Sequence, residues 1–207
     1  MSWKSRRPAP AGNSMESLFV PTLIVALAEI GDKTQLLALL LAARFRQPWP
    51  IVWGIVVATL ANHFAAGAVG NWVAGFFSPA ALSAILAAAF AAVAIWTLIP
   101  DKLDADEESG LKRYGPFLTT LIAFFLAEMG DKTQVATVML AAQYPHFVLV
   151  VIGTTLGMLI ANVPVVLAGN FAADRLPLGL IRRIAAAGFA ALAVYTGYQA
   201  MRLAGWL

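Results

Sequence analysis

The chain of 207 residues contains no cysteine, only two histidines and few charged residues, which make up 12% of the total. The absence of cysteine excludes disulfides, thiolate metal sites and a cysteine nucleophile. Because His63 and His146 are the only histidines, we do not expect a zinc or copper site rich in imidazole. The net charge of +3 is small and gives no indication of nucleic-acid binding.

Hydrophobic residues are what the chain has in abundance. They account for 60% of the sequence, and the mean hydropathy is +0.78. These values lie outside the range of soluble globular domains and indicate an integral membrane protein. We therefore expect an all-α membrane protein with six transmembrane helices, since 207 residues leave room for about six spans of 20 or more residues. The expected spans are residues 17–45, 50–74, 80–100, 116–143, 147–170 and 184–204.

The polar stretches divide the chain into two halves. Residues 1–14 are predicted to be a disordered basic tail, 15–100 a first three-helix repeat, 101–115 a polar central loop, and 116–207 a second three-helix repeat. The basic tail, the apolar run after it and Ala26-Leu27-Ala28 together imitate a signal peptide with its cleavage site. A similar context recurs at Leu126-Ala127-Glu128, where no signal peptide could lie, so we expect no cleavage.

The strongest signal is a charged eight-residue motif that occurs twice within apolar segments. Residues 28–35 read Ala-Glu-Ile-Gly-Asp-Lys-Thr-Gln, and residues 127–134 repeat them with Met in place of Ile, 99 positions later. Gly54 and Gly153 are separated by the same interval. Because each copy would contain three helices, an odd number, the second copy must enter the membrane from the opposite side. The sequence therefore predicts an inverted repeat of the kind found in secondary transporters.

The motif places oxygen ligands inside the membrane. Each charged residue at mid-membrane costs about 3 kcal/mol. Because the charged residues occur in both copies of the motif, we expect them to be functional. On a continuous helix, Glu29, Asp32 and Gln35 would share one face, and so would their counterparts in the second copy. Carboxylate and amide oxygens are ligands that hard divalent cations prefer. The predicted metal ligands are Glu29, Asp32, Gln35, Glu128, Asp131 and Gln134.

Several neighbouring residues are further candidates for the same site. They are Asn62, Asn162, Thr34, Thr133, Lys33 and Lys132. Each has an ordinary alternative: an asparagine can bond a neighbouring helix, a threonine is common in membrane helices, and a lysine can pair with a carboxylate or extend to the interface. Gly31 and Gly130 permit close helix approach or local unwinding. His63 could relay protons, but a single histidine is more often structural.

Competition between protons and a cation for these carboxylates would give antiport. Closely spaced carboxylates in a low dielectric hold protons when no cation is present, and a bound cation expels them. The loops after the first, third and fifth spans hold more Lys and Arg than the other loops and the tail, which favours both termini outside. The basic N-terminal tail argues for the opposite orientation.

The chain resembles a family of calcium/manganese cation:proton antiporters in the lysine-exporter superfamily. The resemblance rests on the motif Glu-x-Gly-Asp-(Lys/Arg)-(Thr/Ser), which occurs once in each of two three-helix halves around a polar loop. The resemblance covers nearly the whole chain from about Met15. It implies export of Mn²⁺ from the cytoplasm in exchange for protons, with Ca²⁺ as a candidate second substrate. It further implies a bacterial inner (plasma) membrane protein with no cofactor beyond the transported ion, no enzymatic activity and no obligatory protein partner. The family's acidic residues correspond to Glu29, Asp32, Glu128 and Asp131, with Gln35 and Gln134 as neighbours.

Three other functions remain open from the sequence. A divalent cation channel could use the same acids, and only flux against a gradient distinguishes the two. An exporter of amino acids or organic cations would lack a tight Mn²⁺ site. An intramembrane aspartyl protease also carries Gly-Asp on two helices, but there the two contexts differ, whereas here they are nearly identical and each adds a glutamate and a lysine.

Overall fold

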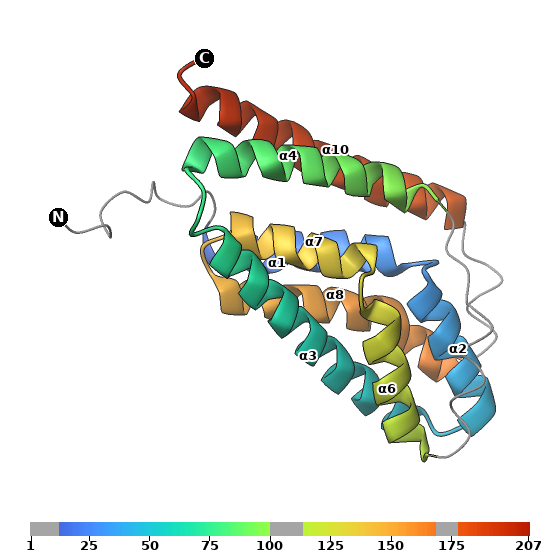
Figure 1. The fold of residues 1–207 in the computed structure, drawn as a ribbon. Helices are drawn as coiled ribbons and strands as arrows, with labels where there is room; N and C mark the ends of the chain where they lie inside the picture. Colours follow the sequence, from blue (N-terminus) through green and yellow to red (C-terminus); the bar gives the residue numbers. More distant parts are fainter. Residues whose placement is uncertain (1–12, 100–113, 169–177) are drawn as a thin grey trace.

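The computed structural model describes residues 13–99, 114–168 and 178–207, and every regular element within these ranges is a helix (Figure 1). Residues 101–113 of the loop expected at 101–115 and residues 1–12 of the tail expected at 1–14 lie outside the described residues. The helices are α1 (Ser14–Glu29), α2 (Lys33–Phe45), α3 (Pro48–Val73), α4 (Pro79–Thr97), α6 (Pro116–Glu128), α7 (Lys132–Gln143), α8 (Phe147–Ala168) and α10 (Leu178–Leu203).

Four of the described helices are long and apolar enough to cross a membrane. They are α3, α4, α8 and the stretch Gly179–Leu203 of α10, while α6 is a shorter apolar helix. Large apolar side chains such as Phe19, Trp53 and Val194 lie on the outside, where lipid would meet them. The prediction of an all-α fold is therefore confirmed for the residues that the structure describes, and the expected second, third, fifth and sixth spans each correspond to one helix that is long and apolar enough to cross a membrane.

The expected first and fourth spans are not continuous helices. Residues 17–45 are divided between α1 and α2, and residues 116–143 between α6 and α7. The break follows from Gly31 and Gly130, whose φ angles of 83° and 74° lie in the left-handed region that glycine adopts without strain. The chain turns tightly there, with the amide of Asp32 donating to the carbonyl of Glu29 at 3.0 Å. The expectation that Glu29, Asp32 and Gln35 share one helix face is wrong, and the alternative of local unwinding at the glycine is confirmed.

Prolines and a capping serine mark the positions at which several helices begin. Pro48, Pro79 and Pro116 occupy the first turns of α3, α4 and α6, where a missing amide hydrogen removes no helical bond. Ser78 caps α4, since its hydroxyl oxygen accepts from the amide of Ala81 at 3.3 Å. At Pro48 and at Pro79 the chain turns from one helix into the next.

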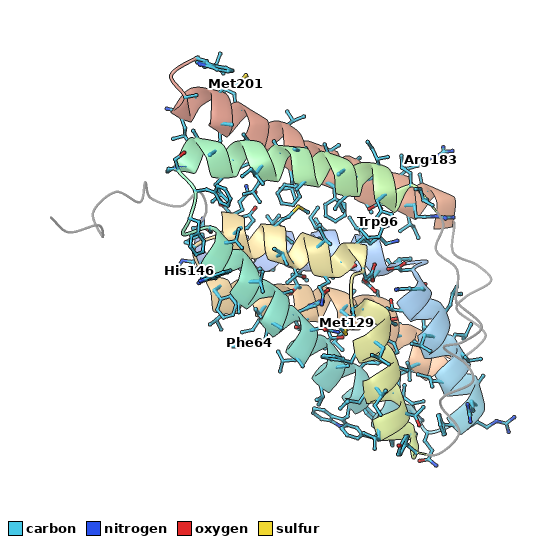
Figure 2. The ribbon with its side chains drawn as sticks, in the orientation of Figure 1. Phe64, Trp96, Met129, His146, Arg183 and Met201 are labelled. Atoms are coloured by element: carbon cyan, nitrogen blue, oxygen red, sulfur yellow. The ribbon has the colours of Figure 1, made fainter. Side chains whose placement is uncertain are left out.

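Helices of one half pack on helices of the other. The α1 helix packs along α8, and α3 packs against both α6 and α7. The α4 and α10 helices lie side by side and run in opposite directions, because α4 begins and α10 ends at the same end of the molecule (Figure 1). Arg183 and Met201 mark the two ends of α10 in Figure 2.

Glycines allow the backbones of these crossing helices to approach closely. A Cβ atom on Gly54 of α3 would lie 2.8 Å from the carbonyl oxygen of Phe117 in α6. A Cβ atom on Gly153 of α8 would lie 2.5 Å from the carbonyl oxygen of Leu18 in α1. Gly153 and Phe117 each lie 99 positions after Gly54 and Leu18, so both crossings use the same residues of the repeat. The spacing read from the sequence is therefore also the spacing of equivalent contacts.

Candidate metal site

The two motifs come together in the interior, although 99 positions separate them in the chain. The Nζ atom of Lys132 lies 3.0 Å from Oδ1 of Asp32. The Thr133 hydroxyl donates to Oε1 of Glu29, and the Thr34 hydroxyl donates to Oε2 of the same carboxylate at 2.5 Å. Glu29 is thus held by one threonine from each motif. The breaks between α1 and α2 and between α6 and α7 therefore form one site.

Each motif stabilises its own turn in the same way. The side-chain oxygen of Gln35 accepts from the amide of Gly31 at 2.9 Å, and that of Gln134 accepts from the amide of Gly130 at 2.8 Å. These amides would otherwise lack a helical partner, because the helix is interrupted there. The second motif's turn is marked by Met129 in Figure 2. The glutamines therefore fix the position of the aspartates that follow the glycines.

Three carboxylates are close enough for one ion to touch them all. Glu29, Asp32 and Asp131 are buried, and each offers an oxygen within 4.8 Å of the other two. An ion such as Ca²⁺ lies about 2.3–2.6 Å from each oxygen ligand, so two ligands on opposite sides of it stand about 5 Å apart. The spacing of these oxygens therefore suits a divalent cation, and both halves of the chain contribute.

Glu128, the fourth predicted acidic ligand, lies beside α3. Its Oε1 accepts from the Thr59 hydroxyl at 2.8 Å, and its Oε2 lies 3.8 Å from Nε2 of His63. It does not belong to the three-carboxylate group found among the described residues. Thr59 was not among the predicted site residues, and His63 was expected to be structural. Their spacing of four residues, which places both on one face of a helix, was the signal that could have found them.

The partial charges at the helix ends contribute to the electrostatic field at the site. Asp32 and Asp131 are the N-cap residues of α2 and α7, whose amide ends carry partial positive charge. Glu29 and Glu128 are the last residues of α1 and α6, whose carbonyl ends carry partial negative charge. The broken helices thus bring both carboxylates and carbonyl ends to the site, an arrangement that transporters use for cations.

The two asparagines make unlike contacts. Asn62 donates to the carbonyl of Phe125 at 2.9 Å and accepts from Nε2 of Gln134 at 3.3 Å. Asn162 donates to the carbonyl of Met158 in its own helix at 3.1 Å. At the repeat spacing of 99, Asn162 corresponds to His63 and not to Asn62. The structure therefore gives the two halves different polar residues beside the motifs.

The two lysines also differ. Lys132 is 2% exposed and contacts Asp32, whereas the Lys33 side chain is only partly buried. The motif residues around them are identical from the glycine to the glutamine. This difference is therefore set by the surrounding helices.

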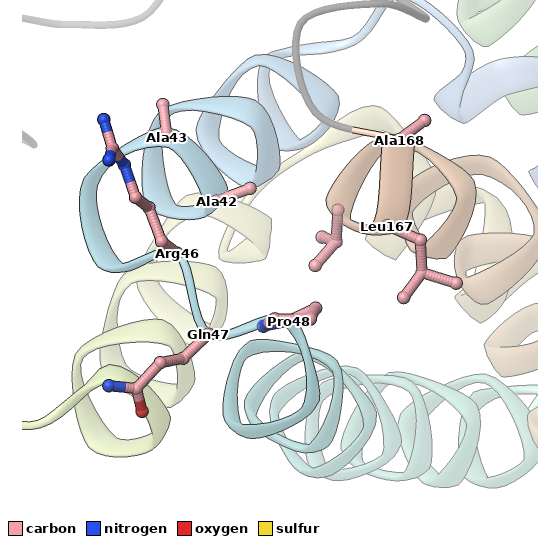
Figure 3. A pocket seen from close by; sticks show the side chains of 8 residues that line it. Ala42, Ala43, Arg46, Gln47, Pro48, Leu167 and Ala168 are labelled. Carbon is pink, nitrogen blue, oxygen red and sulfur yellow. The ribbon is translucent and has the colours of Figure 1, made fainter.

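A separate pocket of about 420 Å³ lies at the turn between α2 and α3 (Figure 3). Arg46 and Gln47 line one side, and Leu167 and Ala168 at the end of α8 line the other. No carboxylate is among its lining residues, so it does not provide the ligands that a cation needs.

Comparison with known proteins matches both halves to one family. Residues 17–105 and residues 116–204 each match the family described as Divalent cation/proton antiporter GDT1. Residue 116 follows residue 17 by 99 positions, the interval that separates the two motifs. The internal duplication is therefore confirmed.

Curated relatives agree with this match. A protein of Vibrio cholerae named "Putative manganese exporter" is 52% identical over 192 residues, which cover 92% of this chain and 95% of that protein. A GDT1-like protein of Synechocystis is 28% identical over 180 residues, which cover 74% of this chain and 83% of that protein. No solved structure matches the chain. This family consists of transporters and not of enzymes, and the chain belongs to it: the divalent cation/proton antiporter family GDT1.

Proposed function

We propose that this protein exports Mn²⁺ from the cytoplasm in exchange for protons, with Ca²⁺ as a second substrate. The observation that carries the proposal is the group of three buried carboxylates, drawn from both motifs, with oxygens within 4.8 Å of one another. The family match and the name of the Vibrio relative support cation export and manganese in particular.

The ligands of the ion are proposed from the same group. Glu29, Asp32 and Asp131 bind it directly, and Glu128 contributes a fourth negative charge beside them. Gln35 and Gln134 act mainly by holding the turns, because their oxygens already accept from backbone amides. Oxygen-only coordination by carboxylates suits Mn²⁺ and Ca²⁺.

Proton exchange follows from burial of these acids. Ionised carboxylates removed from water and close to one another are unfavourable without a compensating cation. Protons supply that compensation when the metal leaves, and the arriving metal displaces them. Binding of the two is therefore mutually exclusive, which is the requirement for antiport.

Alternating access is proposed to use an inverted repeat of two three-helix halves in six spans. In this interpretation α1 with α2 forms the first span and α6 with α7 forms the fourth, each unwound at its glycine. The opposite directions of the equivalent helices α4 and α10 (Figure 1) and the matched glycine crossings support it. The proposed location is the inner (plasma) membrane, with both termini outside.

Proteoliposomes test the proposal directly. Vesicles with an acidic interior should take up Mn²⁺ against its gradient, and a protonophore should stop the uptake. The substitution Asp131→Asn should lower uphill uptake by at least about tenfold, since loss of even an outer-shell group commonly lowers metal affinity 10- to 100-fold. Glu16→Gln makes a matched carboxylate-to-amide change at the exposed start of α1 and should retain uptake.

The alternatives predict different results in the same vesicles. Downhill Mn²⁺ flux that ignores the proton gradient would indicate a channel. Absence of saturable Mn²⁺ binding to the purified wild-type protein would favour an exporter of organic cations. Either result would refute manganese/proton exchange.

A further inference from the structure

Lys132 is a buried cation placed on a carboxylate of the proposed metal site. Its Nζ atom lies 3.0 Å from Oδ1 of Asp32, and the two side chains are 2% and 0% exposed. The contact crosses from the second motif to the first. Asp32 also belongs to the three-carboxylate group.

The ammonium of Lys132 and a divalent ion cannot both bind the Asp32 carboxylate without weakening each other's binding. An ammonium at hydrogen-bonding distance uses the carboxylate oxygen that a metal would approach to about 2.3–2.6 Å. Two cations on one carboxylate also repel each other, and burial weakens the screening of that repulsion. Binding of a metal through Asp32 therefore requires the ammonium to move away.

The lysine side chain is suited to such movement. Its charge stands on a flexible four-carbon stem, unlike the rigid fork of arginine. A purely structural role explains the arrangement less well, because a buried ion pair is weak support for stability. The first motif also forms the same turn with Lys33 only partly buried.

We propose that Lys132 is a tethered competitor of the transported ion. Its ammonium occupies the Asp32 end of the carboxylate group when no metal is bound, and it withdraws when the metal enters. The lysine keeps its charge throughout, so one cation replaces another. This lowers affinity enough for the ion to be released and gives the empty site part of its compensating charge. The inference rests on the proposed function, because it concerns the same site.

Mn²⁺ binding to the purified protein, measured by calorimetry at fixed pH, tests the inference. Lys132→Met removes the charge and keeps most of the side-chain volume, and Lys132→Ala removes both. Each variant should bind Mn²⁺ at least about tenfold more tightly than wild type, as expected for loss of one charge-assisted competing contact. Lys33→Ala is the matched control and should change the affinity less than about twofold, since Lys33 is the less buried counterpart.

Chemical rescue separates competition at the site from simple repulsion at a distance. Methylammonium added to Lys132→Ala should compete with Mn²⁺ and return the apparent affinity toward the wild-type value. It should have no such effect on wild type or on Lys33→Ala. A melting curve of Lys132→Met shows whether the fold is retained without the charge.

The outcomes distinguish this inference from the proposed function. Wild-type protein that binds no Mn²⁺ would refute the proposed function. Wild-type protein that binds Mn²⁺, with folded Lys132→Met binding equally or more weakly, would refute the competitor role alone. Failure of methylammonium to compete in Lys132→Ala would refute it as well.

Discussion

Gly130 offers a sharp test of whether the break between α6 and α7 positions the site. Its φ of 74° lies in the left-handed region, and a Cβ atom added there would meet nothing within 4 Å. Replacement by alanine therefore introduces no steric clash and leaves a single effect, the strain of a left-handed alanine. That strain is about 1–2 kcal/mol.

The strain should reach metal binding because Asp131 follows Gly130 directly. If the turn relaxes toward a normal helix, the aspartate moves out of the group that it forms with Glu29 and Asp32. Holding the turn in place for the ion would then require the full strain energy. We expect Gly130→Ala to weaken Mn²⁺ binding by about 5- to 30-fold, the equivalent of 1–2 kcal/mol, measured by calorimetry on the purified protein.

Gly205 provides the matched control. It also has a left-handed φ, of 76°, with nothing within 4 Å of an added Cβ, and it lies after the end of α10. Gly205→Ala should have the same local strain and leave Mn²⁺ affinity unchanged. Equal loss of binding in both variants, or wild-type binding by Gly130→Ala, would refute the reasoning that this turn positions the ligand.

Two further predictions concern helix packing and Glu128. A Cβ atom on Gly70 would lie 2.0 Å from the carbonyl oxygen of Val138, so Gly70→Ala should separate α3 from α7 and lower stability by about 3 kcal/mol or more, seen as a lower melting temperature in detergent. Gly197→Ala, whose nearest atom is 3.7 Å away, should melt like wild type. Thr59→Val removes the donor to Glu128 and should slow transport by about 10-fold or more through loss of a hydrogen bond to a charged group, with Mn²⁺ affinity changed much less.

Thr196→Val serves as the control for Thr59→Val. Thr196 is also buried, but its hydroxyl donates to the carbonyl of Leu192 in its own helix at 2.8 Å. Transport by this variant should equal that of wild type. A strong loss of Mn²⁺ affinity in Thr59→Val would show that Glu128 ligates the ion together with the other three acids.

Sequence alone predicted the helical class, the duplication and the meeting of the two motifs. It did not establish the break at Gly31, because the three-residue spacing of Glu29, Asp32 and Gln35 also fits a continuous helix. The glycine between the two acids was the available signal. Its left-handed φ decides in favour of unwinding.

The asymmetry between the halves could not be read from the motifs, since both contain Gly-Asp-Lys-Thr-Gln. It comes from the neighbouring long helices. At equivalent positions α3 carries Thr59 and His63, whereas α8 carries Met158 and Asn162. The hydroxyl that α3 donates to Glu128 therefore has no counterpart at the equivalent position of α8, and Glu29 accepts instead from the hydroxyls of the two motif threonines.

The exchange of partners between the halves has a consequence for assembly. Because α1 rests on α8 and α6 rests on α3, each segment finds its main neighbour beyond the central loop. If the chain were split at that loop and the two halves were coexpressed, we would therefore expect them to associate through the glycine contacts and form the complete transporter. Either polypeptide by itself would leave an acidic helix end facing lipid and would lack the proposed metal ligands of the other half.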